Sequence, residues 1–336
     1  MRRKPKFFIA AVWIAVLCAL VFGFPKVGNR GAGLVLGAYT ERAEAAANKS
    51  GKPPIAPVIA SRITDFQQTA SEPAGSQQND SGIHTGVVQA SQPLGPLAFD
   101  SNVKISAKAA LVFDYNTGAI LYSKNPYLEL PIASLTKLIN IAVAMQSPNF
   151  NQPITITAQD KLSTAPVLGL KAGDRVLPED LVKSILVGSA NDAALALSNH
   201  FAGDIGFLHK MNSMANQLGL SHTHYATPIG FDVPGNFSTA EDLAKITEYA
   251  LGHFPYPEIW KNRNFSFTSL GGNRYYIENS NALAGRPGIE SVKTGYTPDS
   301  LGSMIVVAVR PNGEKVVIIV LDSPDRDSDA LKLASQ

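Results

Sequence analysis

The pattern of hydrophobic and polar residues changes twice along this chain and divides it into three parts. Residues 7–24 form an uninterrupted apolar run, FFIAAVWIAVLCALVFGF, directly after the basic stretch MRRKPK. From about residue 45 to 103, Ser, Gln, Pro, Gly and Ala dominate and no period of 2 or 3.6 residues is sustained. After residue 105, segments with strand or helix spacing follow one another. The pattern predicts a basic flank and apolar segment (1–25), a flexible tether (26–104) and a folded domain (105–336).

The apolar run is typical of an export signal. It exceeds the roughly 7–15 apolar residues of a cleaved signal peptide and approaches the about 20 residues of a membrane-spanning helix. A small-x-small site, Ala43-Glu44-Ala45, comes only well downstream. These features favour an uncleaved anchor with the rest of the chain outside the membrane, or a secreted protein if the signal is cleaved. The only cysteine, Cys18, lies inside the run, which excludes disulfides and a thiol nucleophile in the exported part.

The folded domain begins and ends with predicted strands and has predicted helices between them. Such an order favours an α+β domain in which the terminal strands share one antiparallel sheet. Turn residues predict a hairpin at Asn116–Gly118, and strand patterns lie within 264–279, 288–297, 302–311 and 314–323. Apolar spacing predicts helices over 134–145, from about 178 to a break at 188–189, through the Ala/Leu stretch after that break, over 204–220 and over 238–253. The last of these helices opens with a capping-box pattern of Ser238 and Glu241.

Composition and charge narrow the class of protein further. The chain has 336 residues, of which 45% are hydrophobic, so that one main domain is expected. Its 29 basic and 27 acidic residues give a formal net charge of +2. A charge this small gives no electrostatic reason to expect binding to nucleic acid.

A serine and a lysine three residues apart, Ser134 and Lys137, are the first candidate catalytic pair. A serine hydroxyl is a poor nucleophile until a base removes its proton. A lysine three residues later on a helix lies on the same face, within reach of the hydroxyl. It acts as a base only when uncharged, which requires burial or a nearby second cation. The spacing alone is weak, because Ser101 and Lys104 in the tether share it.

Two further motifs follow in order and strengthen the assignment. Ser189 and Asn191 stand in GSAND at the predicted helix break, and the sequence Lys293-Thr294-Gly295 stands on a predicted strand. The ordered set S-x-x-K, S-x-N and K-T-G is the signature of penicillin-recognising serine enzymes.

With these residues the chain resembles the D-alanyl-D-alanine carboxypeptidase family of low-molecular-mass penicillin-binding proteins. The resemblance extends from Ile105 to about Leu333 and includes the blocks SAKAALVFDYNTGAILYSKNP, LGLKAGDRVLPEDLVKSILVGSANDAALAL and MANQLGLSHTHYATPIGFD. It implies a β-lactamase/transpeptidase-like fold, with an antiparallel five-stranded sheet, helices on both faces and a helical subdomain. The implied activity is removal of the terminal D-alanine from peptidoglycan stem peptides, without cofactor or metal and with β-lactams as covalent inhibitors.

The resemblance also implies roles for the motif residues. Ser134 would attack the carbonyl between two D-alanines and Lys137 would take its proton. Ser189 would relay a proton to the leaving D-alanine, and Asn191 would hold the substrate or the base.

The strand motif would bind the end of the substrate. Lys293 and Thr294 would bind the terminal carboxylate, and Lys293 would also keep the base uncharged. The backbone N–H groups of the nucleophile and of Tyr296 would bind the oxyanion, and Gly295 would give the substrate access to the strand. Arg326 is a candidate for a second contact with the substrate carboxylate. The alternative interpretation is that Arg326 is only a solvated charge near the end of the chain.

The chain departs from related enzymes in two respects. Ala190 occupies the middle of S-x-N, where class A β-lactamases have Asp, and no Glu-rich loop follows before Lys293, so rapid β-lactam hydrolysis is not expected. The family's common C-terminal β domain and amphipathic anchor are not found before Gln336, so the N-terminal run is expected to attach the protein to the membrane.

Several other functions stay open at this point. A D,D-endopeptidase that cleaves peptidoglycan cross-links would use the same serine chemistry. A zinc peptidase would draw on His222, His224 and Asp232, although no H-E-x-x-H motif is present. An inactive cell-wall-binding module is disfavoured by the intact motifs, and a Ser-His-Asp hydrolase by the absence of G-x-S-x-G.

Overall fold

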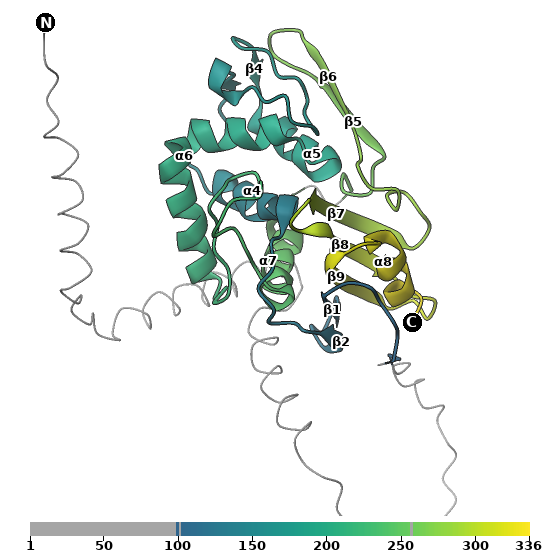
Figure 1. Ribbon diagram of the computed structural model, residues 1–336. Helices are drawn as coiled ribbons and strands as arrows, with labels where there is room; N and C mark the ends of the chain where they lie inside the picture. The colour runs from purple at the N-terminus through teal and green to yellow at the C-terminus, as the bar shows by residue number, and fades with distance from the viewer. Residues whose placement is uncertain (1–98, 101, 256–257) are drawn as a thin grey trace, which may run out of the picture. The chain divides into compact units, whose positions relative to one another are not determined.

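The computed structural model describes residues 99–100, 102–255 and 258–336 (Figure 1). The predicted signal anchor and almost all of the predicted tether lie outside these residues. Within the described part of the chain, no helix is both long enough and apolar enough to cross a membrane.

A five-stranded antiparallel sheet joins the two ends of the folded domain, as the sequence predicts. The strand order is β2-β1-β9-β8-β7, so β1 lies between its hairpin partner and the last strand, while β7 is an edge. The hairpin predicted at Asn116–Gly118 joins the first two strands. The strands are β1 (Ala109–Asp114), β2 (Ile120–Lys124), β7 (Ile289–Thr297), β8 (Leu301–Val309) and β9 (Lys315–Ser323).

Helices cover both faces of this sheet, because the central strands β8 and β9 carry continuous runs of buried apolar residues, 304–308 and 316–321. Ile318 on β9 packs into the core on the side of α8 (Arg326–Ala334), and its neighbour Ile319 packs into the core on the opposite side. Neither side chain is exposed to solvent. Figure 1 shows α8 on one side of the sheet and α7 (Ala240–His253) on the other. The predicted burial of the sheet between helices is therefore confirmed.

The helical subdomain adjoins the β7 edge of the sheet. Its central helix, α4, packs against α6 and α7. The long α6 is interrupted at Gly203, whose φ of 65° and ψ of 158° are not helical. The remaining elements are a 3-10 turn η1 (Ala133–Thr136), α4 (Lys137–Met145), β3 (Ile154–Thr155), η2 (Ala158–Asp160), β4 (Arg175–Val176), α5 (Pro178–Gly188), α6 (Asn191–Gln217), β5 (Asn264–Thr268) and β6 (Arg274–Glu278).

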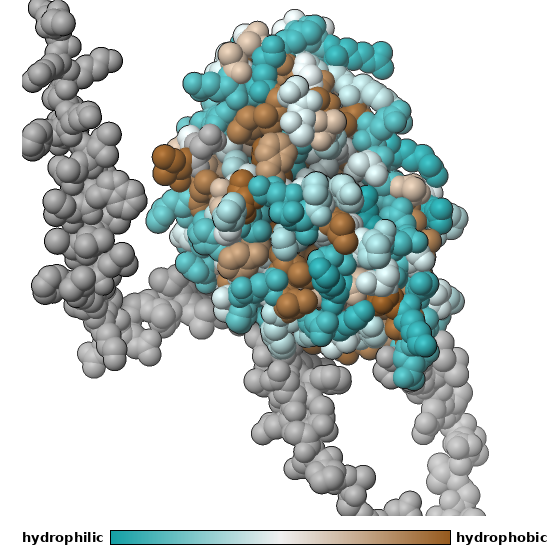
Figure 2. Space-filling model, viewed as in Figure 1, coloured by the Kyte–Doolittle hydropathy of each residue, from teal (hydrophilic) through white to brown (hydrophobic). Residues whose placement is uncertain are grey.

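The β5–β6 hairpin forms a separate two-stranded sheet that packs on α5. Its strands alternate cleanly: Phe267 and Tyr275 are paired across the hairpin with ring centroids 5.2 Å apart on the packed side, and Tyr276 is exposed on the other. On the face drawn in Figure 2, apolar residues lie in small groups separated by polar ones, as expected when the large apolar surfaces are inside.

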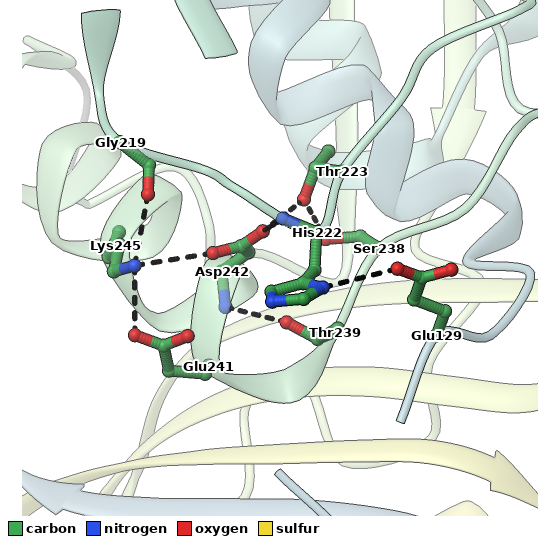
Figure 3. Close-up of polar contacts among 9 residues, drawn as sticks. All are labelled: Glu129, Gly219, His222, Thr223, Ser238, Thr239, Glu241, Asp242 and Lys245. Carbon is green, nitrogen blue, oxygen red and sulfur yellow. Dashed lines mark hydrogen bonds and ion pairs between the residues drawn. The ribbon is translucent and has the colours of Figure 1, made fainter. Parts of the chain in front are cut away.

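Two local predictions differ from the structure. The α-helix begins at Lys137, and Ser134 lies on the 3-10 turn before it, where Ala133 has a φ of +46°. The predicted capping box of Ser238 and Glu241 is wrong by one residue. Thr239 is the N-cap of α7, because its extended backbone places its hydroxyl 3.1 Å from the N–H of Asp242 (Figure 3).

Candidate active site

The 3-10 turn brings Ser134 and Lys137 together. In such a turn, side chains three residues apart eclipse one another. The Nζ atom of Lys137 lies 2.7 Å from the Oγ atom of Ser134. Lys137 is completely buried, whereas Ser134 is half-buried, so the hydroxyl can be reached from outside and the amine cannot.

Burial and a second cation change the state of the Lys137 amine. Burial lowers the pKa of Lys137 well below its usual value, and the charge of Lys293 lowers that pKa further. The amine also donates to the backbone oxygen of Ile229 at 2.6 Å. An uncharged amine in hydrogen-bond contact with a hydroxyl can accept the hydroxyl's proton.

Lys293 links the strand motif to the second motif. Its Nζ donates to Ser189 Oγ at 2.8 Å and to the backbone oxygen of Thr294 at 2.9 Å. Ser189 stands in the left-handed region, with φ of 59°, at the break between α5 and α6. Burial lowers the pKa of Lys293 to about 7, with a smaller contribution from the charge of Arg326.

Asn191 holds the loop that faces it. Its backbone N–H donates to Pro166 O at 2.8 Å, and its side-chain amide donates to Thr164 O at 2.9 Å. Asp192, the next residue, accepts N–H groups from the same loop at residues 168, 169 and 170. The structure therefore places Asn191 beside Ser189, with its amide nitrogen bound to this loop.

The edge strand β7 passes directly against the 3-10 turn η1, which is called the nucleophile turn below because it carries the predicted nucleophile Ser134. A Cβ atom on Gly295 would lie 2.9 Å from Ile132 O and 3.0 Å from Ser134 N, so only glycine fits there. The next residue, Tyr296, follows with its side chain 66% exposed. The close approach brings the backbone of K-T-G to Ser134, as the predicted oxyanion pocket of Ser134 and Tyr296 would require.

Arg326 begins α8 and lies against the back of the same strand. Its Nη1 atom donates to Gly295 O at 2.6 Å, and its side chain is one-fifth exposed. Gly302 on β8 makes room for it, since a Cβ there would lie 3.1 Å from the Cβ and Cδ atoms of Arg326. Arg326 is thus anchored to the K-T-G backbone and is not a freely solvated charge.

Sequence reasoning missed three contributors to this site. The carbonyl of Ile229 is a backbone group, which no residue type reveals. Gly230 has a φ of +87°, and a Cβ there would lie 2.0 Å from Ala133 O, so this loop also packs against the nucleophile turn. Ser280 lies 3.0 Å from Thr294, hydroxyl to hydroxyl, and is exposed. Of these three contributors, only the loop Pro228-Ile229-Gly230 could have been noticed in the sequence, because glycine is common where a chain turns.

The histidines considered as zinc ligands do not converge. His222 Nδ1 lies 3.2 Å from Glu129, and its backbone N–H donates to Asp242 (Figure 3). His224 Nδ1 instead contacts Gly235 O at 2.6 Å, and Asp232 accepts the N–H of Asp299. Among the described residues, no three His, Cys, Asp or Glu side chains come together as a metal site would require. The geometry gives no support to the zinc alternative.

The low pKa of Lys293 predicts an unusual dependence of stability on pH. An unfolded lysine titrates near 10.4, so between about pH 7 and 10 the unfolded state binds more protons than the native state, and stability rises with pH. Each unit of pKa difference corresponds to about 1.4 kcal/mol. The urea midpoint of the wild type is expected to increase from pH 7.5 to 9.5, and that of Lys293→Met to increase less. An equal increase of the urea midpoint from pH 7.5 to 9.5 in the wild type and in Lys293→Met would contradict a lowered pKa of Lys293.

Together, a hydroxyl, a buried amine, a second lysine and a glycine-lined strand edge form the arrangement that a serine acyl-transfer site with a lysine base requires. Residues 95–325 match the family described as D-alanyl-D-alanine carboxypeptidase, and the chain therefore belongs to this family.

Individual relatives agree with this assignment. D-alanyl-D-alanine carboxypeptidase DacD of Escherichia coli is 32% identical over 248 residues, which cover 68% of this chain and 62% of that protein. DacA of Haemophilus influenzae is 28% identical, covering 66% of this chain and 58% of that protein. A D-alanyl-D-alanine endopeptidase of Pseudomonas aeruginosa is 30% identical, covering 66% and 72%. The chain thus spans about three fifths of the length of the two carboxypeptidases.

Solved structures show the same fold. A D-alanyl-D-alanine carboxypeptidase of Mycobacterium tuberculosis has 29% sequence identity and a TM-score of 0.61, covering 69% of this chain and 87% of that one. A mutant of the Streptomyces K15 DD-transpeptidase has 27% identity and a TM-score of 0.64, covering 69% and 97%. The predicted β-lactamase/transpeptidase-like fold is confirmed.

Proposed function

We propose that this protein is a serine-type D-alanyl-D-alanine carboxypeptidase, which removes the terminal D-alanine from peptidoglycan stem peptides. The observation that carries this proposal is the buried Lys137 amine 2.7 Å from the Ser134 hydroxyl, with its pKa lowered by burial and by Lys293. Family membership and the names of the relatives support the same substrate class.

The reaction proceeds through an acyl-enzyme. Ser134 Oγ attacks the carbonyl carbon between the two D-alanines while its proton passes to the Lys137 amine. The backbone N–H groups of Ser134 and Tyr296 stabilise the oxyanion. Ser189 relays a proton to the nitrogen of the leaving D-alanine as the peptide bond breaks. A water molecule then hydrolyses the ester and regenerates the serine.

Positive charge and hydroxyl groups at the strand motif recognise the substrate's terminal carboxylate. Lys293 and Thr294 bind it, with Ser280 adding a hydroxyl 3.0 Å from that of Thr294. Arg326 contributes its charge from behind the strand through its contact with Gly295. The carboxylate in turn favours the charged form of Lys293, so that substrate binding helps to keep Lys137 uncharged.

β-Lactams are covalent inhibitors of this site in the proposal. Their strained amide acylates Ser134 as the peptide does. Ala190 in the second motif and the absence of a Glu-rich loop after Asn191 in the sequence favour a long-lived adduct over rapid hydrolysis.

The proposed location is the outer face of the cell membrane. The apolar run at residues 7–24 would anchor the chain, and residues 26–104 would let the peptidase domain reach the cell wall. Cleavage of the signal would give a secreted enzyme instead.

A direct test combines covalent labelling with product release. We expect the wild-type protein to form a penicilloyl adduct that mass spectrometry maps to Ser134, and to release D-alanine from a stem pentapeptide. An adduct on another residue would overturn the nucleophile assignment. An adduct on Ser134 without D-alanine release, combined with cleavage of a cross-linked dimer, would favour the endopeptidase alternative.

A further inference from the structure

A buried amide, Asn140, stands one helical turn after the base. It lies on α4, three residues beyond Lys137, and its side chain is completely buried. Its Nδ2 atom donates to Pro228 O at 3.0 Å and to Ala194 O at 3.2 Å. Its Oδ1 atom is buried and has no hydrogen-bond partner within the described part of the chain.

The first of these bonds holds the loop that contacts the base. Pro228 immediately precedes Ile229, whose carbonyl oxygen accepts a hydrogen bond from the Lys137 Nζ atom at 2.6 Å. Two successive carbonyl groups of one loop are therefore held by two side chains of one helix, Asn140 and Lys137. The second bond, to Ala194, ties the same amide to α6, the helix that begins at Asn191.

The position of the Ile229 carbonyl decides which way the amine faces. An uncharged amine has two N–H groups and one lone pair, and only the lone pair can accept the proton of Ser134. Donation of one N–H group to Ile229 O leaves the lone pair available in the direction of Ser134 Oγ, 2.7 Å away. If the carbonyl moved, the amine could rotate and water could reach it.

The unpaired Oδ1 atom of Asn140 raises the question of why an asparagine, and not an apolar residue, occupies this buried position. A buried polar atom without a partner destabilises the native state, and each such atom calls for an explanation. Leucine has nearly the same shape and would bring no unpaired acceptor of its own, but it could not donate to Pro228 O. The hydrogen bonds that the Asn140 amide nitrogen donates to Pro228 O and Ala194 O therefore explain why an amide stands at this buried position.

We propose that Asn140 is a positioning residue for the general base: it fixes the Pro228–Ile229 segment, so that the Ile229 carbonyl orients the Lys137 amine and water is kept from it. This inference rests on the proposed serine peptidase function. The charged group acting on Lys137 is Lys293 on β7, and Arg326 on α8 acts on Lys293. On α6, Asp192 has its carboxylate bound to backbone N–H groups of the facing loop.

The test is the pH profile of penicillin acylation in Asn140→Leu. Without the amide, the carbonyl drifts and water enters, so the Lys137 pKa rises and the acid limb of the profile moves to higher pH by about half a unit or more. The maximal acylation rate is expected to fall about tenfold to a hundredfold, because the base is no longer aligned.

A matched control separates positioning from stability. Asn212 is also a helical asparagine whose amide donates to two carbonyls, those of Leu208 and Tyr225, and it is partly buried. Asn212→Leu is expected to lower the melting temperature while leaving the acid limb where it is in the wild type. If Asn140→Leu does not fold, Asn140→Ser, which is too short to hold both carbonyls, is expected to show the same upward movement of the limb.

The possible outcomes are distinct. A wild type that forms no penicilloyl adduct would overturn the proposed function itself. A wild type that acylates normally, with an Asn140 variant whose acid limb superimposes on it, would overturn only the positioning role, even if that variant melts earlier. An acid limb that moves equally in Asn212→Leu would also overturn it, because the effect would then be general loosening.

Discussion

Lys137→Met is expected to lower the rate constant of penicillin acylation by about 10²–10⁴-fold, the usual contribution of a general base. Methionine keeps most of the buried volume and removes the only amine within 2.7 Å of the Ser134 hydroxyl in the described structure. It also relieves the burial of an ionisable group, so the variant is expected to be at least as stable as the wild type to thermal unfolding. The measurement is stopped-flow or gel-based labelling with fluorescent penicillin.

Lys124→Met is the matched control for this substitution. Lys124 is half-buried and its amine donates to two backbone carbonyls, those of Ile105 and Ala107, far from the nucleophile turn. It is expected to acylate at the wild-type rate. Normal labelling of Lys137→Met, or equal loss in both variants, would be incompatible with Lys137 as the base.

Gly230→Ala is expected to destabilise the domain and to abolish most penicillin labelling. An alanine at φ of +87° costs about 1–2 kcal/mol. Its Cβ would lie 2.0 Å from Ala133 O, and such overpacking adds about 1–3 kcal/mol. The loop must then retreat from the nucleophile turn, carrying the Ile229 carbonyl away from Lys137. Urea unfolding and labelling of the remaining folded protein measure the two effects.

Gly173→Ala distinguishes the clash from backbone strain. Gly173 has the same φ of +87°, but no atom lies within 4 Å of its added Cβ. Only the backbone cost of about 1–2 kcal/mol is expected there, with labelling unchanged. If Gly230→Ala proved as mild as Gly173→Ala, the contact of the loop with the nucleophile turn would be wrong.

Strongly patterned segments made most of the fold predictable from the sequence. The continuous apolar runs 304–308 on β8 and 316–321 on β9 are typical of central strands buried on both faces, and the Asn116–Gly118 turn predicts the first hairpin. The capping box was placed one residue early because Ser238 and Thr239 are both good caps, and only the backbone geometry selects Thr239. The separate pairing of β5 with β6 depends on packing against α5, which strand propensity does not contain.

The parts of the candidate site that are formed by side chains could be predicted from the sequence, whereas the parts formed by backbone groups could not. The S-x-x-K, S-x-N and K-T-G residues are identified by type and order. The Ile229 carbonyl is not, because every residue has one and its direction depends on Gly230. Asn140 reads in the sequence as one polar residue in an apolar helix, and only its two carbonyl partners give it a role.

The placement of β1 beside β9 has a consequence for biosynthesis. Ala109 pairs with Leu321, so β1, the first strand of the domain, can pair with β9 only after residues more than 200 positions later in the chain have been synthesised. Contacts between such distant parts of a chain form slowly. A nascent or C-terminally truncated chain that lacks β9 has no strand to join the β1–β2 hairpin to the K-T-G hairpin. A chain that lacks β9 is therefore expected not to assemble this sheet, and not to hold the K-T-G edge beside Ser134.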